Sequence, residues 1–124
     1  MTQVMVDMSV TLLHHGHVRL LKKAKEIGIV VVSLATDEQI IKYKKVVPLL
    51  NYEARKEILS AIKYVDKIVS CSMYYIDDNF LKKHKCDFLV HGDDNQNLVS
   101  KNKLIIFSRT EGISSTKLRN EKNF

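Results

Sequence analysis

The sequence contains no tryptophan, one proline, four glycines and two cysteines in 124 residues. Cys71 and Cys86 have no CxxC spacing, which excludes a disulfide framework and fits two small buried side chains in a reducing compartment. No apolar run approaches the ~20 residues of a membrane-spanning helix, and the N-terminus lacks the basic-then-apolar pattern of a secretory signal. We therefore expect a cytosolic protein without membrane contact.

The length is that of one domain, with room for one core and one site across residues 1–124. Apolar residues make up 45% of the chain and charged residues 27%. This balance is typical of a soluble globular fold and excludes a disordered chain.

The net charge is +6, from 20 basic and 14 acidic residues. Such an excess favours an anionic partner. The basic residues form short clusters without interleaved aromatic residues, and no RNA-binding or zinc-finger pattern accompanies them. A small phosphorylated ligand explains the charge equally well, so we expect no nucleic-acid partner.

The sequence predicts strands and helices in regular alternation. Helical spacing and capping residues indicate helices at 18–27, after Thr36, at 52–65, at 76–84 and from about 114. Apolar runs indicate strands at 4–10, 29–35, 67–70, 87–91 and 103–107, and the segment 42–51 with Pro48 is expected as a loop. This order predicts an α/β fold, a five-stranded parallel sheet with helices on both faces. Ligands of such sheets bind beyond the carboxyl ends of the strands.

The segment after the first strand, LLHHGHVRLL, holds three of the five histidines. His14 and His17 have the spacing of a metal-binding pair, but no third ligand at the usual spacing accompanies them. Alternatively, Gly16 lets the chain turn into a helix whose N-terminal amides hold a phosphate, with the imidazoles as hydrogen-bond donors. Surface histidines are the third interpretation. Three histidines at one strand-to-helix junction favour the phosphate site.

The segment RTEGISSTKLR follows the last strand. Gly112 permits a tight turn, and the hydroxyls and amides from Ser114 to Thr116 begin a helix, which together form an anion site. An ordinary capped helix is the alternative, and the nearby Arg109 makes it less favoured.

Together, HHGH at 14–17 and RTEGISSTKLR at 109–119 resemble the HxGH and RTEGIST signatures of the small bacterial cytidylyltransferases. That family includes glycerol-3-phosphate cytidylyltransferase and the enzymes that activate phosphonates such as 2-aminoethylphosphonate. The resemblance extends over residues 5–119. It implies a Rossmann-like nucleotidyltransferase fold, CTP as substrate, Mg²⁺ as cofactor and a homodimer.

Three shorter segments also match the family. Tyr43 to Lys45 resembles its mobile lysine loop, Asn51 to Leu59 its YExRK helix, and His91 to Asp94 its GDD segment. Without the two signatures, these segments would be interpreted as a solvated charge run, a surface helix with intrahelical ion pairs, and a turn.

The resemblance also implies a role for individual residues. The implied catalytic residues are His14, His17, Lys44, Lys45 and Arg109. The implied nucleotide contacts are Ser9, Val10, His14, His15, Gly16, His17, Asp94, Arg109, Thr110, Glu111, Gly112, Ile113, Ser114, Ser115 and Thr116. The implied acceptor-binding residues are Lys44 and Arg55, and the implied metal ligands are Asp93 and Asp94.

The sequence departs from the family at one position in particular. The family has an acidic residue three positions before the first motif histidine, and Thr11 stands there in this chain. Other positions favour the phosphonate branch over the glycerol-phosphate branch. Asp7 to Ser9, Tyr43-Lys44 and His91 resemble the phosphonate branch, whereas 70–75 has no lysine and Asn95 replaces the tryptophan of the glycerol-phosphate branch.

The predicted reaction joins CTP to a small phosphate or phosphonate monoester and releases pyrophosphate, giving a CDP- or CMP-linked product. The acceptor oxyanion is already ionised at neutral pH, so catalysis depends on positioning and on charge stabilisation. Two alternatives remain. One is a relative that binds nucleotide without turnover, supported by Thr11, and the other is a nucleic-acid-binding module, supported only by net charge.

Overall fold

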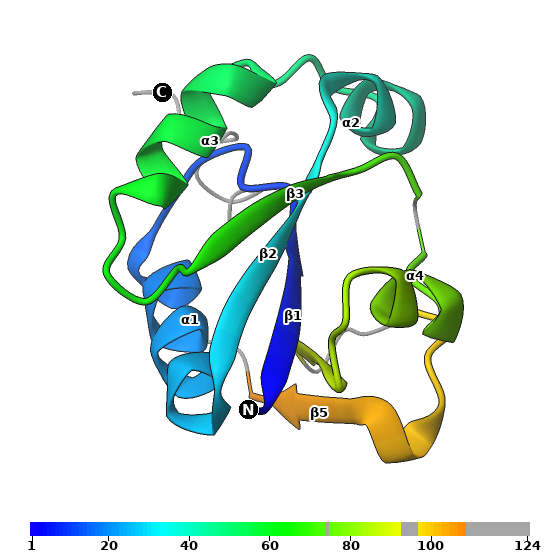
Figure 1. Cartoon of the computed structure of the whole chain (residues 1–124). Coiled ribbons are helices and arrows are strands. Elements are labelled where there is room, and N and C mark those ends of the chain that lie inside the picture. The colour runs from blue at the N-terminus through cyan, green and yellow to red at the C-terminus, as the bar shows by residue number, and fades with distance from the viewer. Residues whose placement is uncertain (74, 93–96, 109–124) are drawn as a thin grey trace.

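The computed structural model describes residues 1–73, 75–92 and 97–108 (Figure 1). Its centre is a five-stranded, all-parallel sheet in the order β3-β2-β1-β4-β5. The strands are β1 (Gln3–Met8), β2 (Ile29–Ala35), β3 (Lys67–Cys71), β4 (Phe88–Gly92) and β5 (Leu104–Phe107). The predicted α/β class with a parallel sheet is confirmed.

Four α-helices and one 3₁₀ turn lie between these strands. They are α1 (His15–Ile27), α2 (Asp37–Lys44), α3 (Tyr52–Ser60), α4 (Asp78–Lys83) and the 3₁₀ turn η1 (Lys101–Lys103). Each α-helix begins after a residue whose side chain accepts a hydrogen bond from a first-turn amide: His14, Thr36, Asn51 and Asp77, respectively. Such caps satisfy amides that have no partner within the helix.

Two apolar clusters cover the two faces of the sheet, with α1 and α3 on one face and α4 on the other (Figure 1). On the first face, Leu21 of α1 and Leu59 of α3 join the strand residues Val4, Val6 and Val32 in one cluster. On the second, Met5, Val31 and Leu89 join Phe80 and Leu81 of α4. Cys71 and Cys86 are buried free thiols, as their sequence context predicts.

The boundaries of several elements differ from the prediction. β1 ends at Met8 instead of residue 10, because Val10 has a left-handed backbone with φ of 51° that turns the chain out of the strand. α1 begins at His15, three residues early, because His14 caps it. α2 continues through Lys44, so the predicted loop is shorter.

The predicted helix at 52–65 is too long, since α3 ends at Ser60. Ile58 and Ala61 are exposed. A series of tight turns follows the helix, and the amide of Asp66 then donates to the Val30 carbonyl at 3.0 Å, which starts the approach to β3. Ile62 and Val65 still pack on the core, so their apolar character reflects burial in a turn. The helix expected from about Ser114 lies outside the described residues.

The strand order reverses at β1. The chain passes from β1 to β2 through α1 on one face, and reaches β4 from β3 through α4 on the other (Figure 1). A crevice between adjacent strands at such a reversal is the usual ligand position in an open α/β sheet. The carboxyl ends of β1 and β4 therefore mark the expected site.

Candidate active site

His14 and His17 form a reciprocal cap at the start of α1. The Gly16 amide donates to His14 Nδ1 and the His14 amide donates to His17 Nδ1, both at 3.1 Å. The two ring centroids are 3.8 Å apart. Because both Nδ1 atoms accept hydrogen bonds, the hydrogen of each neutral ring is on Nε2. The cap thus fixes two imidazoles as Nε2–H donors at the carboxyl end of β1.

His17 is neutral under ordinary conditions. Burial, the His14 imidazole and the Lys44 ammonium together lower the pKa of His17 to about 3. A protonated ring would also lose the acceptor that holds the His14 amide. His17 therefore offers a hydrogen-bond donor at Nε2. Its pKa is too low for it to accept a proton at neutral pH.

Zinc is not favoured at this turn. Both Nδ1 atoms are used by backbone amides, and no group of three or more His, Cys, Asp or Glu side chains in the described part of the chain is placed to hold a metal ion. The donors present suit phosphate oxygens instead.

Lys44 at the end of α2 reaches the same edge of the sheet. Its Nζ donates to Ser9 Oγ at 2.7 Å, although Lys44 and Ser9 are 35 residues apart in the chain. Lys45 follows in a left-handed conformation with φ of 59° and ends the helix. The structure thus brings Ser9, His17 and Lys44 together, as the resemblance implies, and these groups carry the donors and positive charge that a triphosphate requires.

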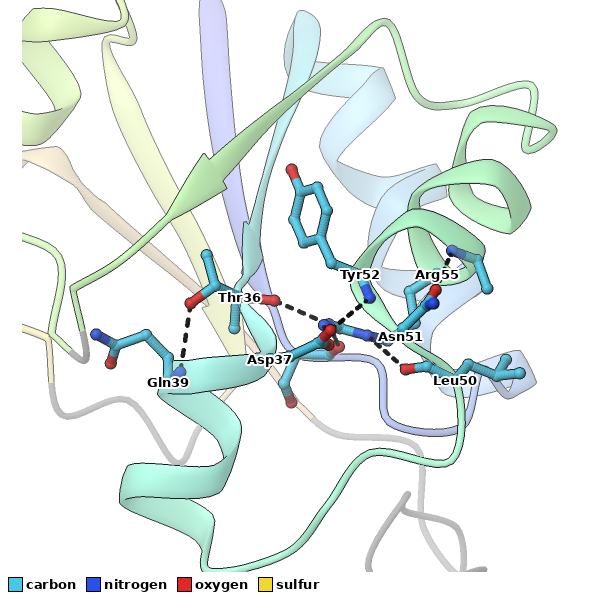
Figure 2. A network of polar contacts seen from close by, with 10 residues as sticks. Thr36, Asp37, Gln39, Leu50, Asn51, Tyr52 and Arg55 are labelled. Atoms are coloured by element: carbon cyan, nitrogen blue, oxygen red, sulfur yellow. Dashed lines mark hydrogen bonds and ion pairs between the residues drawn. The ribbon is translucent and has the colours of Figure 1, made fainter.

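Arg55 of α3 is also near this edge, but its side chain is buried. Figure 2 shows it within the polar contacts between α2 and α3. Its guanidinium donates to the carbonyls of Leu50, Ser9 and Ala35 at 2.6–3.1 Å and pairs with Asp37 at 2.6 Å. The Arg55 side chain has 0% exposure, whereas that of Asp37 has 36%. These contacts join α3 to the ends of β1 and β2.

The alternative interpretation of α3 as a surface helix with intrahelical ion pairs is wrong for Arg55. Its ion pair is with α2, and its side chain is buried. The contact between Arg55 and the acceptor stays a prediction. Arg55 holds the carbonyl of Ser9, the residue whose hydroxyl contacts Lys44.

A third polar group was not predicted as part of the site. His91 Nδ1 and Asp7 Oδ1 are 2.5 Å apart, and Asn97 Nδ2 donates to Asp7 Oδ2 at 3.1 Å. Asp7 is in β1, His91 is in β4, and both side chains are about one-fifth exposed. The signal in the sequence is one polar residue near the end of each strand, and both residues belong to segments that resemble the phosphonate branch.

For the other predicted residues the structure gives burial but no contact that indicates a role. Thr11 is fully buried and Val10 nearly so, whereas His15 is exposed on the first turn of α1. The remaining predicted residues, which are Asp93, Asp94, Arg109, Thr110, Glu111, Gly112, Ile113, Ser114, Ser115 and Thr116, lie outside the described part of the chain.

A family model described as cytidylyltransferase-like matches residues 11–121. The chain belongs to this family. It is 39% identical over 116 residues to glycerol-3-phosphate cytidylyltransferase of Staphylococcus aureus, with 89% of this chain and 86% of the relative covered. It is 34% identical over 127 residues to ethanolamine-phosphate cytidylyltransferase of Dictyostelium discoideum, with 94% of this chain covered. The chain spans only 35% of that second relative.

A solved structure supports the fold of this cytidylyltransferase-like protein. The lipopolysaccharide core biosynthesis protein of Thermoplasma volcanium superposes with a TM-score of 0.73 at 22% identity, covering 89% of this chain and 98% of the other. The predicted family and its Rossmann-like fold are therefore confirmed. Among the described helices, none combines the length and apolar character needed to cross a bilayer.

Proposed function

We propose that the protein is a cytidylyltransferase that joins CTP to a small phosphate or phosphonate monoester. The observation that carries this proposal is the pair of capped imidazoles beside Lys44 and Ser9 at the carboxyl end of β1. Membership of the cytidylyltransferase-like family supports the nucleotide. Relatives named for glycerol-3-phosphate and for ethanolamine phosphate support a phosphorylated acceptor.

In the proposed reaction an acceptor oxygen attacks the α-phosphorus of CTP. A new oxygen–phosphorus bond forms, the bond from the α-phosphorus to the α–β bridging oxygen breaks, and pyrophosphate leaves with that electron pair. The Nε2–H groups of His14 and His17 donate to the oxygens that gain charge, and Lys44, Lys45 and Arg109 neutralise the phosphates. No general base is needed, because the acceptor oxygen is already ionised.

Mg²⁺ remains part of the proposal as a companion of the triphosphate. The described residues at the phosphate site offer imidazoles, an ammonium group and hydroxyls, which do not form the oxygen-rich shell that Mg²⁺ prefers. The carboxylates of Asp93 and Asp94, which the resemblance implies as ligands, lie outside the described residues. The steps above therefore use the side chains of the protein alone.

We further propose an acceptor with an amine, such as ethanolamine phosphate or 2-aminoethylphosphonate. The carboxylate of Asp7 lies at the carboxyl end of β1, in a protein whose net charge is +6. A carboxylate there would weaken the binding of phosphate, but it would stabilise an ammonium group at the other end of the acceptor. This observation favours the amine over glycerol-3-phosphate.

A pyrophosphate-release assay with CTP and a panel of acceptors tests the proposal. We expect the highest kcat/KM for ethanolamine phosphate or 2-aminoethylphosphonate and a lower value for glycerol-3-phosphate. If glycerol-3-phosphate has the highest kcat/KM, the proposal that the acceptor carries an amine is wrong.

A second candidate is a relative that binds nucleotide without turnover. Thr11 favours this second function. It is fully buried and stands where the family has a carboxylate. Binding of CTP in a titration, together with no pyrophosphate from any acceptor, would identify this function.

A further inference from the structure

Three polar side chains form one row across the sheet where the strand order reverses. Asp7 of β1 pairs with Ser33 of β2, and His91 of β4 lies on its other side in the β1–β4 register. The residues two positions earlier on the same strands belong to the apolar cluster on the α4 face: Met5, Val31 and Leu89. Because side chains alternate along a strand, the polar row lies on that face also. The carboxylate in the middle of the row therefore has a neighbour on each side.

The Asp7 carboxylate is turned toward β4. Its Oδ1 lies 2.5 Å from His91 Nδ1, and its Oδ2 accepts from Asn97 Nδ2 at 3.1 Å. The side chain of Asp7 is 19% exposed. A carboxylate accepts up to about four hydrogen bonds, so in this orientation Asp7 can bind an ammonium group as well.

The hydroxyl of Ser33 is the neighbour on the other side. Ser33 is 1% exposed, and no group among the described residues forms a hydrogen bond with its Oγ. A buried hydroxyl without a partner is destabilising, and a carboxylate is a strong acceptor. Adjacent strands are only about 4.8 Å apart, so a turn of Asp7 toward β2 would satisfy Ser33. The observed orientation of Asp7 is therefore opposed by a competing partner.

Asn97 is held in place by contacts that do not involve Asp7. Its Oδ1 accepts from the Ile76 amide at 2.7 Å, and the Leu98 amide donates to the Ile76 carbonyl at 2.8 Å. Three residues further on, the Ser100 amide donates to the Asp78 carboxylate at 2.8 Å. The segment 97–100 is thus fastened to the start of α4, and the Asn97 amide meets Asp7 from a fixed position.

We propose that Asn97 is a positioning residue, which keeps the Asp7 carboxylate turned toward β4 and away from the competing hydroxyl of Ser33. This inference rests on the proposed function, in which Asp7 stabilises the amine of the acceptor. Turned toward Ser33, the carboxylate would be buried and lost to the ammonium group. Asn97 thereby determines how well the protein uses an acceptor that carries an amine.

The first experiment compares Asn97→Ala with Asp78→Ala, with kcat/KM for ethanolamine phosphate measured by pyrophosphate release. We expect a loss of ~10-fold or more in Asn97→Ala, because a misplaced binding group is costly, and an unchanged Kd for CTP. Asp78→Ala is the matched control, since it loosens the same segment at Ser100 and leaves the contact with Asp7. Equal losses in the two variants would show that Asn97 only holds the segment, and would overturn the proposal.

The second experiment removes the competing hydroxyl. In the double variant Ser33→Ala/Asn97→Ala, His91 still holds Asp7 and no hydroxyl draws it toward β2. We expect kcat/KM for ethanolamine phosphate to return to within ~3-fold of the wild type, since the two sites are coupled through Asp7. Damage to the structure would not be reversed by this change, so a double variant as slow as Asn97→Ala would overturn the proposal.

Ser33→Ala alone provides a further check. It removes a buried hydroxyl without a partner, so its Tm should equal or exceed that of the wild type, and its kcat/KM should be unchanged. A loss of kcat/KM in this single variant would show that the hydroxyl itself serves the reaction, and would overturn its role as a competitor. If Asn97→Ala does not fold, Asn97→Leu, which is close to asparagine in volume, replaces it in the same comparison.

Asp7→Asn separates this inference from the proposed function. The preference for ethanolamine phosphate over glycerol-3-phosphate should fall in this variant. If the preference is unchanged, the proposed amine is wrong, and the role of Asn97 is wrong with it. If the preference falls in Asp7→Asn and is unchanged in Asn97→Ala, only the role of Asn97 is wrong.

Discussion

The two ring nitrogens of His17 have separate roles, so they can be tested separately. Nδ1 accepts from the His14 amide and thereby supports the helix start. Nε2 is the donor to phosphate oxygens in the proposed reaction. An asparagine side chain places an oxygen near the position of Nδ1 but has no group at the position of Nε2. Substitution by asparagine therefore removes the donor while the cap remains.

We expect His17→Asn to lower kcat by ~10²-fold or more, typical of removing one transition-state donor. The Kd for CTP should change much less, because the hydrogen bond strengthens as charge develops. Steady-state kinetics and CTP titration measure the two effects. A raised KM with an unchanged kcat would show that His17 contributes to binding alone.

His17 also makes stability depend on pH. Its folded-state pKa of about 3 lies below the unfolded value of 6.5, so between these values the unfolded chain binds more protons. The stabilisation is therefore complete above pH 6.5 and is lost as pH falls toward 3, by up to about 1.4 kcal/mol per pH unit. Urea unfolding of wild type and His17→Asn from pH 7 to 4 measures it.

The free energy of unfolding of the wild type should fall relative to that of the variant as pH falls. If the free energy of unfolding depends on pH equally in the two proteins, His17 has its ordinary pKa in the folded protein. The carbon-bound ring protons of His17 provide a second readout, since their NMR shifts should stay constant from pH 8 to 5.

At the scale of elements, α3 is held to the sheet by the buried polar side chain of Arg55 in addition to the apolar packing of Leu59. Arg55 connects α3 to the carbonyls at the ends of β1 and β2 and to the first residue of α2 (Figure 2). Removing it leaves three carbonyls and a carboxylate without this donor. A lysine at 55 carries the charge but has a single nitrogen, which cannot reach all four partners.

We expect Arg55→Lys to lower the free energy of unfolding by roughly 3 kcal/mol, and turnover to fall with it, because the Ser9 backbone shifts. Urea denaturation measures the first effect and pyrophosphate release the second. Lys56→Ala is the matched control, since Lys56 is the exposed neighbour and its substitution should change stability by less than about 0.5 kcal/mol. Equal stability of the two variants would contradict this role.

The elements themselves were largely predictable from the sequence. The strand at 29–35 is aliphatic except for Ser33, and Thr36 caps the helix that follows, so both boundaries agree with the structure. The helix at 52–65 was extended too far because Ile62 and Val65 continue the apolar spacing beyond Ser60. Apolar spacing reports burial, and a turn packed on the core gives the same signal as a helix.

At the scale of the whole molecule, the order of strands determines which residues meet. His91 and Asn97 are 84 and 90 residues from Asp7 in the chain. Their contact depends on β4 lying beside β1, and the alternation of elements along the sequence does not determine strand order. His14 and His17 are candidates from the sequence alone because they lie close together in the chain, whereas the cap that they form at the start of α1 is not predicted.

We expect CTP to stabilise the whole domain. At 100 times its Kd, a ligand that binds only the folded state raises the free energy of unfolding by about 2.7 kcal/mol. Thermal denaturation with CTP, ATP and a single-stranded oligonucleotide measures this. CTP should raise Tm by several degrees and the oligonucleotide should not. Stabilisation by the oligonucleotide alone would favour the nucleic-acid-binding alternative.

The reciprocal cap has a consequence for how the reaction responds to acid. Because His17 stays neutral far below physiological pH, mild acidification leaves its Nε2–H donor unchanged. The acceptor itself titrates in that range, since the dianion of a phosphate monoester takes up one proton near pH 6. The acidic limb of the rate profile should then belong to the substrate, and it should move when the acceptor is exchanged while the protein stays the same.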